Sequence, residues 1–415
     1  MPHITILTAV YNAADTLPRC LDSLLGQTLA DIEVICIDDA STDASPAILD
    51  GYARRDTRVR VIHLATNGGQ ARARNAGLAQ AHGEYIGMVD ADDWLAPDAL
   101  HQAWAVTLTH PDADAVLFHL IRTYPDGHEE PFYIHRGSSE SHEACFNGRV
   151  VTEEKVVNGE LAAHEEPQSA GKLRRSAFSS SLQGIMKTSF PSALASSVGC
   201  QFSTLNSQLN NNCQLSIINS QLKNSWSGPE AMRLSLTWQI HGLYIVRSSI
   251  HHAYPYDDSA RLYSDDNTTR LHYLHSRRVY ASAGRYYYYQ NPRSTTQRIT
   301  PLYFQSLIAQ HHMHQLLEAE GIDAPTLAWY DSYRWLQLID NCYYLRLHRR
   351  SFSRAERRDA RTLIRHTWHT FPRAGQQAPL PAYPRKFGYR HCPTYPLFRC
   401  QEALYFTLRL LLRGK

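Results

Sequence analysis

The sequence has few cysteines and lacks long hydrophobic runs. Eight cysteines are scattered over 415 residues, and no two have the Cys-x-x-Cys spacing of structural zinc and redox sites. This argues against a disulfide-stapled domain and favours a reducing compartment. No stretch approaches the ~20 uninterrupted apolar residues of a membrane helix, and no basic residue precedes the short apolar run 1–10. We therefore expect a cytoplasmic protein without a membrane span or signal peptide.

Acidic residues are scarce towards the C-terminal end. From Arg346 onward, 16 lysines and arginines stand against three acids, although the net charge of the whole chain is only +3. A basic tail attracts anionic partners, and charge alone does not choose among nucleic acid, phosphate and a bilayer. The stretch 397–412 mixes Leu, Phe and Tyr with arginine. It is typical of a helix that lies on a membrane surface or of one that packs on its own domain.

The composition is that of a globular protein, 43% apolar and 20% charged, and the length allows two or three domains. In the first hundred residues, apolar strand patterns at 3–10, 33–37, 59–64 and 84–89 alternate with helical patterns at 16–27, 45–52 and 70–81. This rhythm predicts an α/β fold with a doubly wound, mostly parallel sheet. Ligands of such sheets bind at the carboxyl ends of the strands. The residues just past those ends are Tyr11, Asp38, Asp39, Asp90 and Asp92.

The middle of the chain changes character. Residues 161–225 are rich in Ser, Asn and Gln, and Asn-Ser-Gln-Leu occurs at both Asn206 and Asn219. We interpret this segment as a low-complexity polar insertion that is flexible; the alternatives are a small structured inclusion or a leucine-bearing helix. Helical patterning resumes at 229–241, and residues 301–415 are predicted to form a helical, basic C-terminal region.

A crowded acidic motif, Asp90-Ala91-Asp92-Asp93, directly follows the fourth predicted strand. Carboxylates this close repel one another unless a cation neutralises them, and Mg²⁺ or Mn²⁺ prefers oxygen ligands together with substrate phosphates. The motif therefore indicates a metal-diphosphate site. The alternative is an acidic turn that caps the helix expected near Pro97.

Taken together and in order, the strand-end motifs resemble those of the family 2 glycosyltransferases, which have the GT-A fold. The motifs are Tyr11-Asn12, Asp38-Asp39 with Ser41 and Asp43, Asn67 to Gly77, and Asp90 to Asp93. The resemblance covers residues 3–105 and resumes at 228–296. There Ser264-Asp265-Asp266 stands in the place of the family's Glu-Asp pair, and Tyr287 to Thr296 matches its characteristic ending.

The resemblance implies roles for individual residues. It implies a nucleotide-sugar donor, with Ala9 and Tyr11 lining the base pocket, Asp39 at the ribose or base, Arg74 near the nucleotide or its diphosphate, Asp90 at the ribose or sugar, and Asp92 on Mg²⁺ or Mn²⁺. Asp266 is the implied general base of an inverting transfer, and Asp265 is the alternate. The alternative for both is a capping pair for a helix at 268–276. Alanine replaces the family's usual Pro at Ala9 and its usual glycines at Ala40 and Ala44.

The resemblance also implies a domain division and a setting. Residues 1–150 would form the nucleotide-sugar-binding half and 226–300 the half that holds the acceptor and the base. The implied enzyme is a non-processive transferase of cell-surface polysaccharide synthesis, acting on a glycan or lipid-linked acceptor. We expect no nucleic-acid partner, and we expect peripheral contact with the inner face of the cytoplasmic membrane.

Other interpretations stay open. One is a catalytically disabled nucleotide-binding protein on the same fold, held at a membrane by its basic tail. A phosphotransferase with Asp90 as nucleophile is disfavoured by Asp93-Trp94, and a dinucleotide oxidoreductase by the lack of Gly-x-Gly-x-x-Gly. His241, close after Trp238, is interpreted either as a residue facing the acceptor or as a buried core histidine.

Overall fold

The computed structural model describes residues 1–132, 145–146, 149–150, 224–294, 298–371 and 392–412. Residues 1–150 and 224–415 belong to one unit of the chain. The predicted insertion 161–225, including both Asn-Ser-Gln-Leu repeats, lies outside the described residues except for its last two positions.

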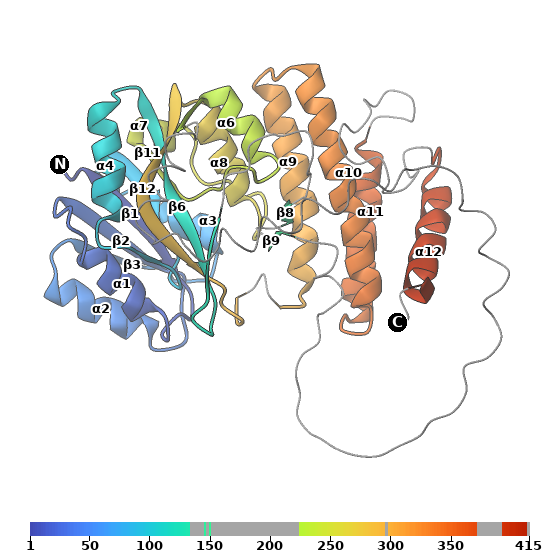
Figure 1. The fold of residues 1–415 in the computed structure, drawn as a ribbon. Coiled ribbons are helices and arrows are strands. Elements are labelled where there is room, and N and C mark those ends of the chain that lie inside the picture. Colours follow the sequence, from blue (N-terminus) through green and yellow to red (C-terminus); the bar gives the residue numbers. More distant parts are fainter. Residues whose placement is uncertain (133–144, 147–148, 151–223, 295–297, 372–391, 413–415) are drawn as a thin grey trace, which may run out of the picture. The chain divides into compact units, whose positions relative to one another are not determined.

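A ten-stranded sheet forms the centre of this unit, in the order β10-β12-β6-β11-β4-β1-β2-β3, with β5 on β12 and β7 on β6 (Figure 1). Strands β1 to β4 pair in parallel, as do β6 and β12, whereas β11 is antiparallel to both of its neighbours. The strands are β1 (Ile4–Val10), β2 (Ile32–Asp38), β3 (Val59–His63), β4 (Tyr85–Met88), β5 (Trp94–Leu95), β6 (Ala113–Thr123), β7 (Glu129–Pro131), β10 (Ser225–Ser227), β11 (Tyr244–Arg247) and β12 (Arg278–Tyr289). A separate pair is formed by β8 (Cys145–Phe146) and β9 (Arg149–Val150). The predicted α/β class with a mostly parallel sheet is confirmed.

Helices cover both faces of the sheet (Figure 1). Along β1, Ile4 and Ile6 pack into a core with α1, while Leu7 packs into a second core with α3. This alternation is the two-residue period of a strand buried on both faces. The helices of this part are α1 (Leu17–Leu25), α2 (Ser45–Arg55), α3 (Gln70–Leu78), α4 (Ala99–Thr109), α6 (Gly228–Ser235), α7 (Ser248–Ala253) and α8 (Asp265–Leu274).

The helix expected over 229–241 is shorter than predicted. It ends at Ser235, and the chain then turns through Trp238, whose φ is 60°. The backbone N–H of Gln239 donates to the carbonyl of Leu234, a turn bond outside the regular helical pattern. The turn allows Tyr244 to enter the sheet as the start of β11.

The C-terminal region is helical, as predicted. It consists of the 3₁₀ helix η1 (Pro301–Gln305) and helices α9 (Ser306–Ala319), α10 (Ala324–Leu347), α11 (Arg354–His369) and α12 (Tyr395–Leu412). These helices bury a hydrophobic core of their own around Trp335, Leu338, Ile364, Phe398 and Phe406. Among the described residues, no helix is long and apolar enough to cross a membrane.

Candidate functional site

The predicted donor residues gather at one edge of the sheet. Strands β2, β1 and β4 are neighbours and run parallel, so their carboxyl ends meet. Tyr11 follows β1, Asp39 follows β2, and Asp90 and Asp92 follow β4. Ala9 is the second-last residue of β1, just before this edge, and is partly buried.

Hydrogen bonds join the loop after β1 to the loop after β2. The backbone N–H of Asn12 donates to Ser41 Oγ at 3.0 Å, and the N–H of Thr42 donates to Asn12 Oδ1 at 2.7 Å. Ala40 has a left-handed φ of 58°, so the backbone keeps this conformation although alanine has a Cβ. The two loops leave Tyr11 with 52% of its surface exposed, as an aromatic ring available at the strand end.

Asp39 is buried and its carboxylate is already engaged. Its two oxygens accept hydrogen bonds from the backbone N–H groups of Gly68 and Gly69, both at 2.8 Å. Gly69 has a φ of 92°, a conformation that suits glycine. Asp39 therefore fixes the loop that starts α3, and a ligand would share its remaining acceptor positions.

Arg74 connects parts of the site that are far apart in sequence. It lies on α3 and is 1% exposed. Its Nη2 is 2.7 Å from Asp90 Oδ1, and its Nη1 is 3.4 Å from Asp265 Oδ2. Gln70, one turn earlier on α3, also donates to Asp90 Oδ1 at 3.0 Å. The guanidinium thus brings the strand-end carboxylate of the first half together with a carboxylate of the second half.

Two carboxylates of the acidic motif, Asp92 and Asp93, differ in how deeply they are buried. Asp93 is fully buried and accepts from the Tyr286 hydroxyl at 2.7 Å and from the Tyr289 N–H at 2.8 Å. Asp92 accepts from Asn291 Nδ2 at 3.1 Å. Burial, followed by repulsion from Asp90, raises the pKa of Asp92. Asp93 is therefore part of the internal structure, whereas Asp92 is only partly buried.

A divalent cation at this edge would need substrate oxygens or water for most of its ligands. Among the described residues, no group of three or more His, Cys, Asp or Glu side chains could enclose a metal ion. Mg²⁺ is commonly bound by one or two carboxylates plus phosphate oxygens and water. Asp92, beside a second carboxylate that repels it, matches that donor set.

Asp265 and Asp266 open α8, and each faces different partners. The N-cap is Ser264, and the helix begins three residues earlier than the sequence predicted, so the two acids lie in its first turn instead of capping it. Asp265 contacts Arg74, whereas Asp266 lies 3.9 Å from Arg270 Nη2. Burial raises the pKa of Asp266 to about 7, with Arg270 opposing the shift and Asp265 adding to it. A carboxyl with such a pKa suits proton transfer near neutral pH.

His241 is a buried core residue, as one of its two interpretations predicted. It is 2% exposed, and its Nδ1 accepts from the N–H of Leu243 at 3.2 Å. Burial lowers its pKa to about 4.

Some residues at this edge were not singled out from the sequence. Arg19 on α1 donates to the backbone carbonyl of Asp92 at 2.9 Å, and its guanidinium lies 3.7 Å from the Trp94 ring centre. Asn291 and Gln70 lie within the motifs named above, but the sequence assigns neither of them a role. The place of Asn291 just after the aromatic run could have identified it as a site residue. Arg19 has no motif around it that could have done so.

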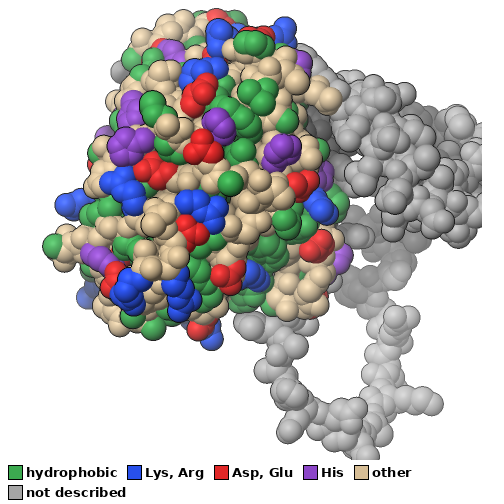
Figure 2. Space-filling model, turned by 90° about the vertical axis from the view of Figure 1, so that its left-hand side faces the viewer, with side chains coloured by type: hydrophobic (Ala, Val, Ile, Leu, Met, Phe, Trp, Pro, Cys, Tyr) green, Lys and Arg blue, Asp and Glu red, His purple; other side chains and the backbone are tan. Residues whose placement is uncertain are grey.

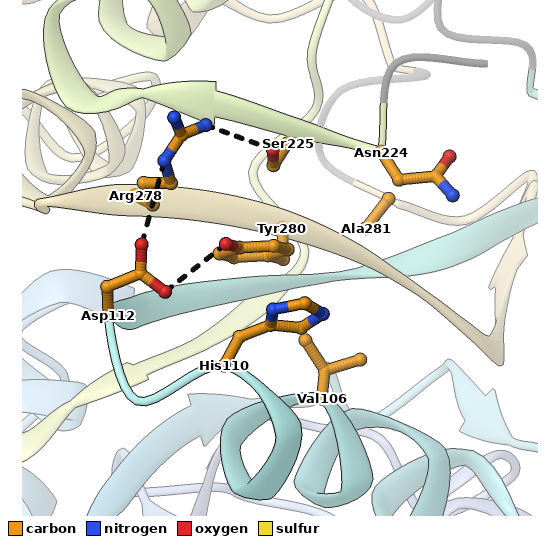
Figure 3. Close-up of a pocket in the computed structure, with 8 residues that line it drawn as sticks. All are labelled: Val106, His110, Asp112, Asn224, Ser225, Arg278, Tyr280 and Ala281. Carbon is orange, nitrogen blue, oxygen red and sulfur yellow. Dashed lines mark hydrogen bonds and ion pairs between the residues drawn. The ribbon is translucent and has the colours of Figure 1, made fainter.

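A cavity of about 770 Å³ lies elsewhere, near the first residues of β6 and β12 (Figure 3). The Tyr280 hydroxyl donates to Asp112 at 3.2 Å, and Arg278 pairs with Asp112 and donates to Ser225. His110 stacks on the Tyr280 ring at 4.4 Å. These polar groups satisfy one another, and the cavity contains none of the residues predicted to bind donor or acceptor.

Sequence comparisons place the match in the first part of the chain. Residues 5–178 match the family model for glycosyl transferase family 2. The chain is 48% identical over 96 residues to the uncharacterized glycosyltransferase EpsJ of Bacillus subtilis, which covers 23% of this chain and 28% of EpsJ. It is 43% identical over 102 residues to the succinoglycan biosynthesis protein ExoO of Rhizobium meliloti, covering 25% and 29% of the two chains. The chain thus spans less than a third of the length of both relatives.

Among solved structures, similarity extends over more of the chain at low identity. S. aureus TarS matches with a TM-score of 0.46 and 18% identity, over 86% of this chain and 44% of TarS. Residues 1–349 of TarS in complex with UDP-GlcNAc match with a TM-score of 0.45 and 16% identity, over 89% and 92% of the chains.

Proposed function

Because the chain belongs to glycosyl transferase family 2 through the domain matched at residues 5–178, we propose that it transfers a glycosyl group from a nucleotide-sugar to a glycan or lipid-linked acceptor. The proposed setting is the synthesis of a cell-surface polysaccharide at the inner face of the cytoplasmic membrane. A relative named for succinoglycan biosynthesis supports the part of this setting that concerns polysaccharide synthesis.

One observation carries the proposal: buried Arg74 contacts both Asp90, at the end of β4, and Asp265, at the start of α8. A transferase must hold a donor and an acceptor-activating group in one small space. The Arg74 contacts support such proximity, because they join two acids 175 positions apart in the chain.

For the donor, the proposal assigns the nucleotide to the loops after β1 and β2. Exposed Tyr11 offers a face for stacking a base, Ala9 would line the same pocket, and Asp39 offers acceptor positions to a base or ribose. Asp90 would contact the ribose or the sugar. Arg74 would hold Asp90 in place and contribute positive charge near the diphosphate.

For catalysis, Asp92 would hold Mg²⁺ or Mn²⁺ on the donor diphosphate. When bound, such an ion offsets the negative charge that develops on the leaving diphosphate. Asn291 would orient the Asp92 carboxylate through its hydrogen bond. A carboxylate of α8 would then take the proton from the acceptor hydroxyl as the oxygen attacks the anomeric carbon opposite the diphosphate, which inverts the configuration.

The choice of base lies between the two acids of α8. The raised pKa of Asp266 favours it as a base working near neutral pH. Its contact with Arg74 favours Asp265 as the acid nearer the donor. We retain Asp266 as the proposed base and Asp265 as the alternate.

The test is nucleotide release and glycosyl transfer with a panel of UDP-, GDP- and dTDP-sugars in the presence of Mg²⁺ or Mn²⁺. Asp92→Ala should abolish metal-dependent release. Asp31→Ala is the matched control, because the Asp31 side chain is 58% exposed and precedes β2, at the end of the strand opposite to the site. If the intact chain binds a nucleotide-sugar and releases nothing with any acceptor offered, the alternative of a catalytically disabled nucleotide-binding protein replaces the enzyme.

A further inference from the structure

Helix α11 presents a row of arginines on one exposed face. The row consists of Arg354, Arg358, Arg361 and Arg365. Spacings of four, three and four residues place them along one side of a helix. The opposite side is buried through Ala360 and Ile364. Of the two acids on α11, Asp359 lies 3.6 Å from Arg358 and Glu356 is engaged in the capping box with Ser353, so the exposed row keeps an excess of positive charge.

Helix α12 is apolar on two sides, and among the described residues only one of these sides is covered. Phe398 and Phe406 are buried in the core of the C-terminal region. The other side exposes Leu397, Leu404 and Leu408, with 42%, 63% and 48% of their surface accessible. An apolar stripe on a helix is normally covered by another apolar surface. Within the part of the chain that the structure describes, the exposed leucines have no such cover.

The C-terminal end of the arginine row lies beside the first residue of α12. The Arg365 guanidinium lies 5.9 Å from the ring of Tyr395, the first residue of α12, and the Trp368 ring lies 5.6 Å from the same ring. At the other end of α12, Thr407 accepts a hydrogen bond from Arg346 at 2.6 Å, next to Leu347, which is 54% exposed. On the face drawn in Figure 2, by contrast, positive and negative side chains are interspersed.

We propose that α11 and α12 form a docking surface for a bilayer that contains anionic phospholipid. A membrane interface takes up apolar side chains while anionic headgroups attract neighbouring arginines, so a bilayer uses both rows at once. A nucleic acid would pair with the arginines and leave the leucines in water. This inference deepens the membrane contact of the proposed function, because it names the surface and the lipid class.

The experiment is sedimentation of the full chain with vesicles of phosphatidylcholine alone and of phosphatidylcholine mixed with phosphatidylglycerol. We expect binding only to the mixed vesicles, weakened by salt. Each arginine near an anionic surface contributes about a fivefold change in partitioning. Arg358→Gln with Arg361→Gln should therefore lower binding at least ~10-fold. Arg54→Gln with Arg55→Gln, two exposed arginines of α2, is the matched control and should bind as the unchanged chain does.

A second variant tests the leucine row independently. Leu404→Ser removes the most exposed leucine and should weaken binding to the mixed vesicles while leaving the far-ultraviolet circular dichroism unchanged. The inference is overturned if the unchanged chain binds neither type of vesicle, or if it binds duplex DNA through the same arginines instead. It is also overturned if Leu404→Ser dissociates a dimer of this chain, because the leucine row would then be a dimer interface. Nucleotide release is measured in the same preparations without vesicles. A chain that turns over donor without binding vesicles would overturn this inference alone, and a chain that binds vesicles without turnover would overturn only the proposed activity.

Discussion

At the scale of single residues, the two acids of α8 differ in their surroundings in a way that activity can report. Asp266 has an ordinary pKa of 3.8 that burial raises to about 7. Only the ionised carboxylate accepts a proton, so transfer should rise with pH around a midpoint near 7. Asp266→Asn should lower the transfer rate by ~10²-fold or more and remove this dependence.

The same shift affects stability in the opposite sense. Because the folded state holds the Asp266 proton more tightly than the unfolded chain, the free energy of unfolding should fall as pH rises from about 4 to about 7. In the Asp266→Asn variant, this fall in the free energy of unfolding should be absent. If Asp266→Asn keeps full transfer activity and Asp265→Asn loses it, the base is Asp265.

Ala40 offers a test of backbone strain with an internal control. Its left-handed φ costs an L-residue with a Cβ roughly 1–2 kcal/mol. Ala40→Gly should raise the free energy of unfolding by about 0.5–1 kcal/mol, because part of the relief is offset by the greater freedom of glycine in the unfolded chain. Ala44, with a φ of −75°, has no such strain. Ala44→Gly should give no gain in chemical denaturation, and an equal gain at both positions would contradict the explanation.

The sequence identified these residues only in part. Asp90 and Asp92 follow an apolar strand, and the position of a residue after a strand is a local property that a sequence displays. The engagement of Asp39 by Gly68 and Gly69 and the bond from Asn291 to Asp92 across 199 positions depend on tertiary packing, which periodicity does not encode.

At the scale of elements, the absence of a side chain at Gly284 allows α4 to pack closely against the sheet. A Cβ on Gly284 in β12 would lie 2.4 Å from the carbonyl oxygen of Ala99, which begins α4. Gly284→Ala should therefore destabilise the protein by about 1–3 kcal/mol, because a backbone group must shift. Gly51→Ala in α2 is the control. Its Cβ would meet nothing within 4 Å, so it should stabilise the helix by up to ~1 kcal/mol. Thermal unfolding of the two variants measures both effects.

The first strands and helices were predicted to within a few residues because each carries apolar residues at the spacing of its own kind of element. Strand β2, for example, is buried at every residue. Strand β11 was not predicted. It is four residues long, it lies antiparallel between two strands that run the other way, and only its neighbours β4 and β6 determine its place.

At the scale of the whole molecule, the described elements on both sides of residues 151–223 belong to one unit. We predict that a chain in which a Gly-Ser linker replaces residues 161–223 still unfolds in a single cooperative transition and still releases nucleotide from its donor. Calorimetry and the donor assay check the two parts. Loss of folding in this variant would show that the segment is required for the core. Nucleotide release by the shortened chain alone would show that the segment inhibits the enzyme.

The single buried arginine on α3 has a consequence for how this molecule can be re-engineered. Arg74 is held by one acid from each half of the chain. Replacing residues 224–294 with the matching segment of a relative would leave a charged guanidinium without one of its two counter-ions, unless the replacement carries an acid at the position of Asp265. Exchange of this segment between relatives should therefore succeed only where the three-residue contact is transplanted intact.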